Sequence, residues 1–137
     1  MNYLLDTNVL SEPQQKVASL KVIEWLKTHE SHLYTSTVVI AEIAFGIEAL
    51  PPGPKRARLA IWLRQTLRIM RGRILAPNIR VALEWGRLAA EAKERGRPLP
   101  FRDSLIAATA RRYRLAVATD NTADFADCGV MVTNPFD

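Results

Sequence analysis

Short apolar segments alternate along this chain with longer amphipathic segments, and this alternation limits the folds available to it. Such an order predicts an α/β fold: a central, mainly parallel sheet flanked by helices in an α/β/α sandwich. The length of 137 residues fits one domain, residues 1–137. The expected strands are Tyr3–Leu5, His32–Thr35, Arg73–Ala76, Leu115–Thr119 and Gly129–Val132. The expected helices are Lys16–His29, Ser36 or Thr37 to about Leu50, Lys55–Arg71, Asn78–Gly96 with both ends as caps, and about Arg102–Arg112.

The charge of the chain points to an anionic partner. Nineteen Lys and Arg residues face 14 Asp and Glu residues, for a net charge of +5. Arginine dominates the cations, and guanidinium groups match phosphate and carboxylate geometry. Four arginines lie along one expected helix and just after its end: Arg64, Arg68, Arg71 and Arg73. They either guide an anionic backbone or form a solvated face.

Several classes of protein are excluded by what the chain lacks. Cys128 is the only cysteine, so an intrachain disulfide and a cysteine-based zinc cluster are excluded. The six glycines never cluster into a P-loop or a dinucleotide-binding turn. No apolar run approaches the roughly 18 residues of a membrane span, and the first residues lack the basic region of a signal peptide. We therefore expect a cytoplasmic protein with no membrane partner.

Several carboxylates lie at positions where α/β folds commonly place their functional residues. Asp6 follows the first expected strand, and Asp120 follows the strand Leu115–Thr119. The carboxyl ends of parallel strands meet at one edge of the sheet. Glu42 lies in an apolar helical segment, and Asp103 begins a helix with an apolar body. Each acid alone has an ordinary structural explanation, but several together at one point need a cation, for which Mg²⁺ or Mn²⁺ with oxygen ligands is the best match.

The acids belong to four segments that together resemble one known family. The segments are Asp6–Pro13, Ala41–Ile43 with Gly46-Ile47, Asp103–Ala110, and Thr119–Phe125 with Gly129-Val130 and Asn134–Phe136. Their order resembles the PIN-domain ribonucleases, and more narrowly the VapC and FitB toxins of type II toxin–antitoxin systems. The resemblance covers essentially the whole chain and implies a single PIN domain.

The resemblance also implies which residues form the site. In a PIN fold Asp6, Glu42 and Asp103 converge at the carboxyl edge of the sheet, with Asp6 and Asp103 as direct metal ligands. A fourth catalytic group comes from the loop after the strand Leu115–Thr119, and Asp124 is the first choice. Asp120 stands where relatives commonly carry a basic or neutral residue, so the fourth group stays open among the loop residues. The remaining candidates are Asn121 and Asp120 for this group, and Thr7 and Asn8 for holding water or phosphate.

The function implied is that of a Mg²⁺-dependent endoribonuclease, with Mn²⁺ as a plausible substitute, in which a metal-activated water cleaves RNA. Such toxins form homodimers and are held by a small VapB-like antitoxin that covers the site. A non-catalytic or weakly active RNA-binding PIN module is the alternative. Two other enzyme classes fit poorly. A haloacid-dehalogenase-type phosphatase requires an acid at the position of Asn8, and a receiver domain requires a lysine after a late strand, whereas the last lysine of this chain is Lys93.

Overall fold

Five short parallel strands form one sheet in the computed structural model, which describes residues 1–137. The strand order is β3-β2-β1-β4-β5. Leu4 on the central strand β1 pairs with Tyr34 on β2 and with Val117 on β4. The strands are β1 (Tyr3–Leu5), β2 (Leu33–Ser36), β3 (Ile74–Leu75), β4 (Ala116–Ala118) and β5 (Val132–Thr133). The predicted α/β class with a parallel sheet is confirmed.

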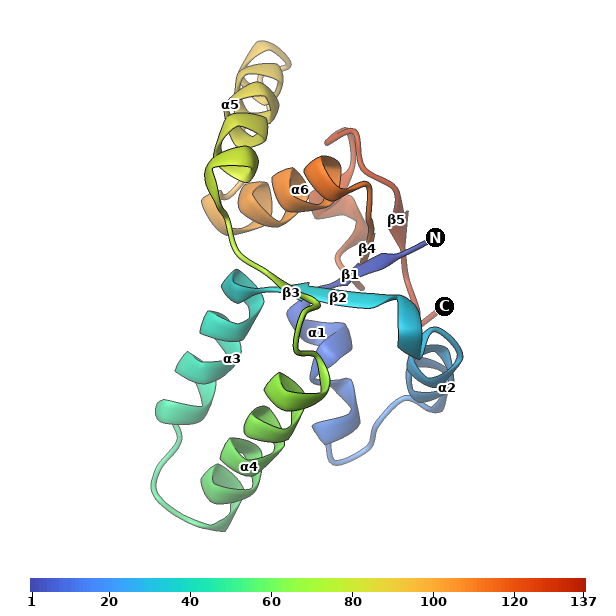
Figure 1. Ribbon diagram of the computed structural model, residues 1–137, viewed down its shortest axis with the longest axis vertical. Helices are drawn as coiled ribbons and strands as arrows, with labels where there is room; N and C mark the ends of the chain where they lie inside the picture. The colour runs from blue at the N-terminus through green and yellow to red at the C-terminus, as the bar shows by residue number, and fades with distance from the viewer.

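Helices cover both faces of this sheet. The helices are α1 (Thr7–Leu10), α2 (Leu20–Thr28), α3 (Thr37–Glu48), α4 (Pro54–Ile69), α5 (Ile79–Glu94) and α6 (Phe101–Tyr113), with 3₁₀ turns at Glu12–Gln14, Glu30–His32 and Thr122–Phe125. Figure 1 shows α1, α3 and α4 on one side of the sheet and α5 and α6 on the other. Connections between parallel strands are right-handed. When the chain places its next strand on the other side of the first one, the connecting helix therefore lies on the opposite face of the sheet.

The strand order reverses between β1 and β4. From β1 the chain adds β2 and then β3 on one side, and it returns across the sheet through α5 and α6 to add β4 on the other side of β1. Open α/β sheets bind ligands outside the carboxyl ends of the strands at such a reversal. The fold therefore places the residues after β1 and β4 together at the position expected for a site.

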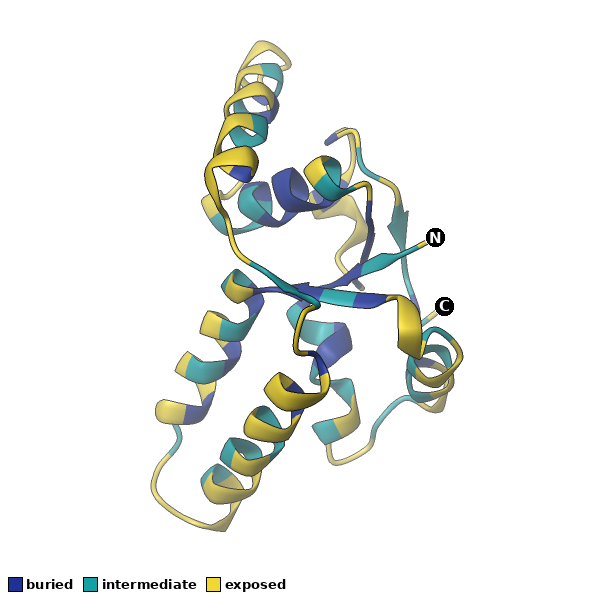
Figure 2. Cartoon of the chain, in the orientation of Figure 1, coloured by how far each residue is buried: buried dark blue, intermediate teal, exposed yellow.

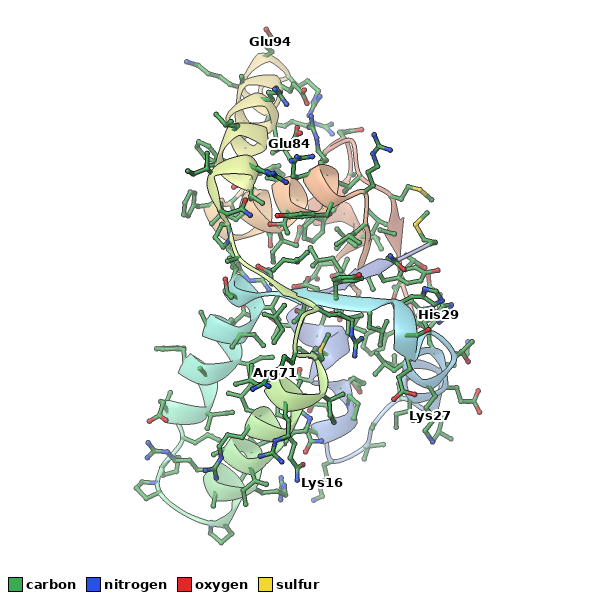
Figure 3. All side chains as sticks on the ribbon, viewed as in Figure 1. Lys16, Lys27, His29, Arg71, Glu84 and Glu94 are labelled. Atoms are coloured by element: carbon green, nitrogen blue, oxygen red, sulfur yellow. The ribbon has the colours of Figure 1, made fainter.

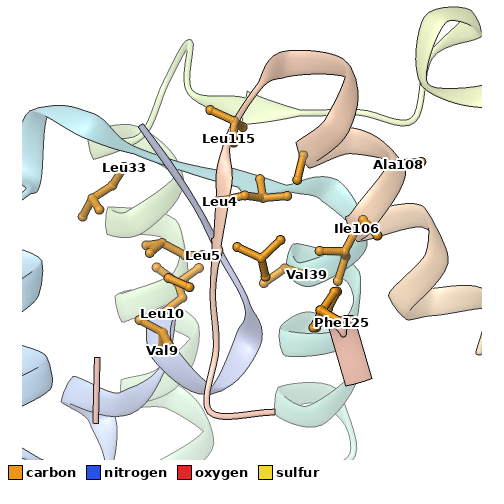
Figure 4. Packing of buried hydrophobic residues seen from close by; sticks show 14 of the residues in the cluster. Leu4, Leu5, Val9, Leu10, Leu33, Val39, Ile106, Ala108, Leu115 and Phe125 are labelled. Atoms are coloured by element: carbon orange, nitrogen blue, oxygen red, sulfur yellow. The ribbon is translucent and has the colours of Figure 1, made fainter. Parts of the chain in front are cut away.

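The hydrophobic core lies between the sheet and its helices. Leu4 and Val117 on the central strands have no exposed surface, and Ile106 of α6 packs into the same cluster. The close-up in Figure 4 shows Leu4, Val39 and Ile106 together, with Phe125 beside them. Figure 2 shows that burial concentrates on the sheet and on the helix faces turned toward it. No helix is long and apolar enough to cross a membrane.

Three elements differ by more than two residues from the sequence-based expectation, and the ends of the others shift by at most two. The helix predicted from Lys16 begins at Leu20, because the Ser19 hydroxyl caps it by accepting from the Val22 N–H, and Val17 is 88% exposed outside it. The last strand is Val132–Thr133 and not Gly129–Val132. The four-residue helix α1 was not predicted.

Arg73 has a structural role that the sequence did not reveal. Its guanidinium donates to the carbonyl oxygens of Leu33 and Glu30 at 2.7 and 3.1 Å, and to that of Ile69 at 3.2 Å. These bonds tie the end of α4 to the start of β2. Arg64, Arg68 and Arg71 remain exposed, and Figure 3 shows Arg71 beside the end of α4.

Three further polar contacts hold α5 against α6. Arg111 of α6 pairs with Glu84 at 2.9 Å and with Glu91 at 2.8 Å, both on α5 (Glu84 is labelled in Figure 3). The indole N–H of Trp85 donates to the Ser104 hydroxyl at 2.8 Å. Trp85 is thus committed to packing between these helices, which fixes the start of α6 relative to the rest of its layer.

Candidate active site

An acidic pocket of about 490 Å³ opens at the carboxyl ends of β1 and β4. None of its nine lining residues is hydrophobic. The structure brings together in it all eight residues that the sequence singled out, and it adds Arg102. The lining residues are Asp6, Thr7, Asn8, Glu42, Arg102, Asp103, Asp120, Asn121 and Asp124.

Asp6 is the most deeply placed of these acids, with 1% of its surface exposed. It directly follows β1 and caps α1, because its Oδ1 accepts from the Thr7 backbone N–H at 2.8 Å. Its Oδ2 accepts from the buried Thr119 hydroxyl at 2.8 Å, and the Asn8 amide lies at 3.4 Å. A buried carboxylate needs such donors, and they fix its orientation in the pocket.

Asn8 links the loop after β1 to the loop after β4. Its side-chain carbonyl accepts from the Asp120 backbone N–H at 3.1 Å, and its amide donates to the Thr119 hydroxyl at 3.3 Å. The same hydroxyl accepts from the Asn121 backbone N–H at 3.0 Å. Both functional groups of Asn8 are therefore used in holding the two loops together, and its role is to position Asp6 and the loop beyond Thr119.

Arg102 lies among three of the carboxylates. Its Nη2 donates to Asp6 Oδ1 at 2.6 Å, its Nη1 donates to Asp103 Oδ1 at 2.7 Å, and its Nε donates to Glu42. Nη2 also donates to the Thr7 hydroxyl at 3.0 Å. Partial burial alone would lower the pKa of Arg102, but the bonds to Asp6 and Glu42 outweigh it and raise the pKa above its ordinary value. The guanidinium therefore stays charged and neutralises part of the acidic cluster.

Asp103 is held at the start of α6 in a partly buried setting. Burial raises its pKa above the ordinary range, the hydrogen bond from Arg102 opposes that shift, and the nearby charges of Asp6 and Asp124 add to it. The influence of Asp6 and Asp124 on the pKa of Asp103 indicates that these three acids share one electrostatic environment.

The loop after β4 supplies the remaining polar side chains. Asp120, Asn121 and Asp124 are all exposed and line the pocket. Asp124 sits in the 3₁₀ turn Thr122–Phe125, which is anchored by the fully buried Phe125. The charge of Asp124 raises the pKa of Asp103, and neither Asp120 nor Asn121 is among the causes of that shift. Asp124 is thus the loop residue most closely coupled to Asp103.

A larger groove of about 860 Å³ adjoins the acidic pocket. The two share Thr7. The groove runs between α3, α4 and the segment after α1, with apolar side chains such as Ile43, Ile47 and Trp62 in it and with Lys16, Lys55 and Arg58 as its basic residues. Figure 3 shows Lys16 beside the first turns of α4.

Comparison with known proteins assigns the family. The model of the PIN domain matches residues 3–129. The chain belongs to the PIN-domain family. Toxin FitB from Neisseria gonorrhoeae is 36% identical to this PIN-domain protein over 135 residues, which are 97% of each chain. VapC ribonuclease Y4jK from Sinorhizobium fredii is 32% identical over 136 residues, 98% of this chain and 97% of the relative.

Solved structures agree with this assignment. The crystal structure of FitAcB from Neisseria gonorrhoeae contains a chain that superposes on this PIN domain with a TM-score of 0.92 and 36% identity, covering 98% of both chains. The resemblance inferred from the four sequence segments is therefore confirmed, and the fold it implied is the fold observed.

The sequence analysis missed Arg102, which lines this PIN-domain pocket, and Thr119, which donates to Asp6 from outside the pocket lining. Thr119 gave no signal, because a threonine at the end of an apolar strand is ordinary. Arg102 did give one: a cation in the first turn of a helix opposes the helix dipole. Its position beside Asp103 is explained by the three carboxylates that surround it.

Proposed function

We propose that this PIN-domain protein is a Mg²⁺-dependent endoribonuclease that acts as the toxin of a toxin–antitoxin pair. One observation carries the proposal: Asp6, Glu42, Asp103 and Asp124 share one wholly polar pocket at the reversal of the strand order. Relatives that bear the names toxin and ribonuclease match nearly the whole chain, which supports both parts of the proposal.

The chemistry of the pocket fits a hard divalent cation. The pocket offers carboxylate oxygens, which hard divalent cations prefer as ligands. The carboxylates of Asp6 and Asp103 already bind one cationic group, the Arg102 guanidinium. We assign Asp6 and Asp103 as the residues that would hold Mg²⁺ or Mn²⁺, with Glu42 and Asp124 completing the catalytic set. A bound ion would polarise a phosphate oxygen and acidify the attacking water.

The residues around these ligands orient them and receive the substrate. Thr119, Asn8 and the Thr7 N–H keep the Asp6 carboxylate in one orientation. The exposed arginines Arg64 and Arg68 of α4 supply positive charge that attracts the RNA backbone.

The proposal is tested by metal removal. The purified protein should cleave a mixed RNA substrate in Mg²⁺, lose cleavage completely in excess chelator, and regain it when Mg²⁺ or Mn²⁺ is restored, because the carboxylates alone supply no activated water. Gel analysis of end-labelled RNA measures this, and DNA of the same sequence serves as the substrate control. Cleavage that persists in chelator would contradict the proposal.

The ion pairs of Arg102 are also the observation that favours the alternative, an RNA-binding PIN module with little or no catalysis. A guanidinium that permanently neutralised Asp6 and Asp103 would leave the pocket without a metal. In that case the protein would retain RNA without cleaving it, and calorimetry would detect no binding of Mg²⁺ or Mn²⁺.

We further propose that a small antitoxin binds the groove between α3 and α4 and extends over the acidic pocket, and that the protein forms a homodimer. The solved structures of the FitAB and VapBC relatives are complexes, and the shared Thr7 makes the groove continuous with the pocket. The apolar floor and basic residues of the groove suit an amphipathic segment with acidic side chains.

The groove assignment can be measured directly. Lys55→Glu combined with Arg58→Glu should weaken antitoxin binding by about tenfold or more, because like charges would then face the acidic segment. Calorimetric titration with the antitoxin encoded beside this chain measures the affinity, and light scattering of the free protein reports the dimer. The exposed pair Arg64→Glu and Arg68→Glu, on the same helix but outside the groove, is the matched control. Equal losses in both double variants would argue against the groove.

A further inference from the structure

The guanidinium of Arg102 occupies the place at which a cation is required. It bridges oxygens of Asp6 and Asp103 at 2.6 and 2.7 Å and also binds Glu42, so three carboxylates converge on one side chain of the same protein. No group of three Asp, Glu, His or Cys side chains is arranged as a ready metal site. The carboxylates are thus arranged around the guanidinium.

The same oxygen atoms cannot serve both cations in this arrangement. Mg²⁺ sits at about 2.0–2.1 Å from its oxygen ligands and demands near-octahedral geometry. Asp6 Oδ1 already accepts two hydrogen bonds, from the Thr7 N–H and from Arg102. A divalent ion on Asp6 and Asp103 would also stand directly against a charged guanidinium, which like-charge repulsion disfavours.

Arg102 is placed so that it can leave. Its side chain is 32% exposed, in contrast to the 1% exposure of the Asp6 side chain. It lies in the first turn of α6, and all of its hydrogen bonds run to residues of the pocket itself. None of these bonds runs to the hydrophobic core, so the side chain can turn toward solvent without a change in the fold when another cation takes its place beside Asp6.

We propose that Arg102 competes with the divalent metal for Asp6 and Asp103 and thereby sets the metal concentration at which the site fills. The inference rests on the metal site of the proposed function. In the metal-free protein the arginine neutralises the buried acids. When the metal concentration is high enough, the ion displaces the guanidinium. The displaced Arg102 side chain then lies at the edge of the pocket, where it can bind a phosphate group of the substrate.

The test measures metal binding in the absence of RNA. Mn²⁺ alone is titrated into the full chain and followed by electron paramagnetic resonance and calorimetry. Arg102→Gln should bind Mn²⁺ about tenfold or more tightly than the parent, because no charged competitor remains. Arg102→Lys keeps the positive charge but loses the planar, forked donor geometry of the guanidinium, so its affinity for Mn²⁺ should lie between those of the parent and Arg102→Gln. Arg112→Gln, which removes an exposed arginine of the same helix, should match the parent.

Thermal unfolding provides a second measurement and a check on folding. Without metal, Arg102→Gln should unfold at a lower temperature than the parent because Asp6 loses its partner, and saturating Mn²⁺ should raise its midpoint more than that of the parent. Equal or weaker Mn²⁺ binding in a folded Arg102→Gln or Arg102→Lys protein would overturn the inference.

The outcome can be separated from that of the proposed function. Tighter Mn²⁺ binding by Arg102→Gln, together with no RNA cleavage by any variant, would support the competition and overturn the nuclease. Absence of Mn²⁺ binding in all the proteins would overturn both.

Discussion

Asp6→Asn should lower RNA cleavage by more than about 100-fold while the protein stays folded. The substitution removes the negative charge of the most buried acid in the pocket, and with it a principal ligand of the proposed metal. An asparagine has the same shape, and its carbonyl can still accept the Thr7 N–H that caps α1. The new amide group would face the Thr119 hydroxyl, which already accepts from Asn8 and Asn121, so the loss of the bond that Thr119 donates should lower stability modestly without unfolding the protein.

The measurement is single-turnover cleavage of labelled RNA in saturating Mg²⁺, with far-UV circular dichroism to confirm the fold. Glu24→Gln makes the same acid-to-amide change at an exposed position of α2 and should leave the rate unchanged. Full activity in a folded Asp6→Asn protein would remove Asp6 from the catalytic set and with it the core of the functional proposal.

Phe125→Ala should lower the free energy of unfolding by about 3–5 kcal/mol, because truncating a buried aromatic ring leaves a cavity. Phe125 is 1% exposed and is the largest of the fully buried side chains. It also anchors the 3₁₀ turn that carries Asp124, so its loss should loosen one wall of the acidic pocket. For a domain whose total stability is of the order of 5–15 kcal/mol, this is a large fraction.

Urea unfolding followed by circular dichroism measures this effect. Phe45→Ala provides the control, because Phe45 is 74% exposed on α3 and its truncation should change the stability by less than about 0.5 kcal/mol. A loss below about 1 kcal/mol for Phe125→Ala would show that the turn is held by other contacts.

Much of the fold could be predicted because its central elements carry strong local signals. Tyr3–Leu5 was predicted at its observed bounds, and the helix capped by Asn78 begins where its cap implies. The strand Val132–Thr133 was misplaced because two residues carry no periodicity, and their register is set by pairing with β4. Helix α1 has only four residues and depends on its Asp6 cap, so its sequence pattern is too short to detect.

The candidate site was predictable in its acids but not in its cation. Asp6 and Asp120 were found because they follow strands, and the fold brings the ends of these strands together. Whether the Arg102 side chain turns into the pocket or out to solvent depends on the positions of Glu42 and Asp6, which are 60 and 96 residues away in the sequence. No local pattern encodes such a contact.

Arg102 and Asp103 are consecutive residues in the first turn of α6. No movement of the helix as a body can separate them, so an exchange between arginine and metal requires only rotation about side-chain bonds. Rotations of this kind in partly exposed side chains take nanoseconds or less, whereas lids and domains open over roughly microseconds to milliseconds. The pocket should therefore respond to the metal concentration without a slow conformational step, and the rate of metal binding should be limited by dehydration of the ion.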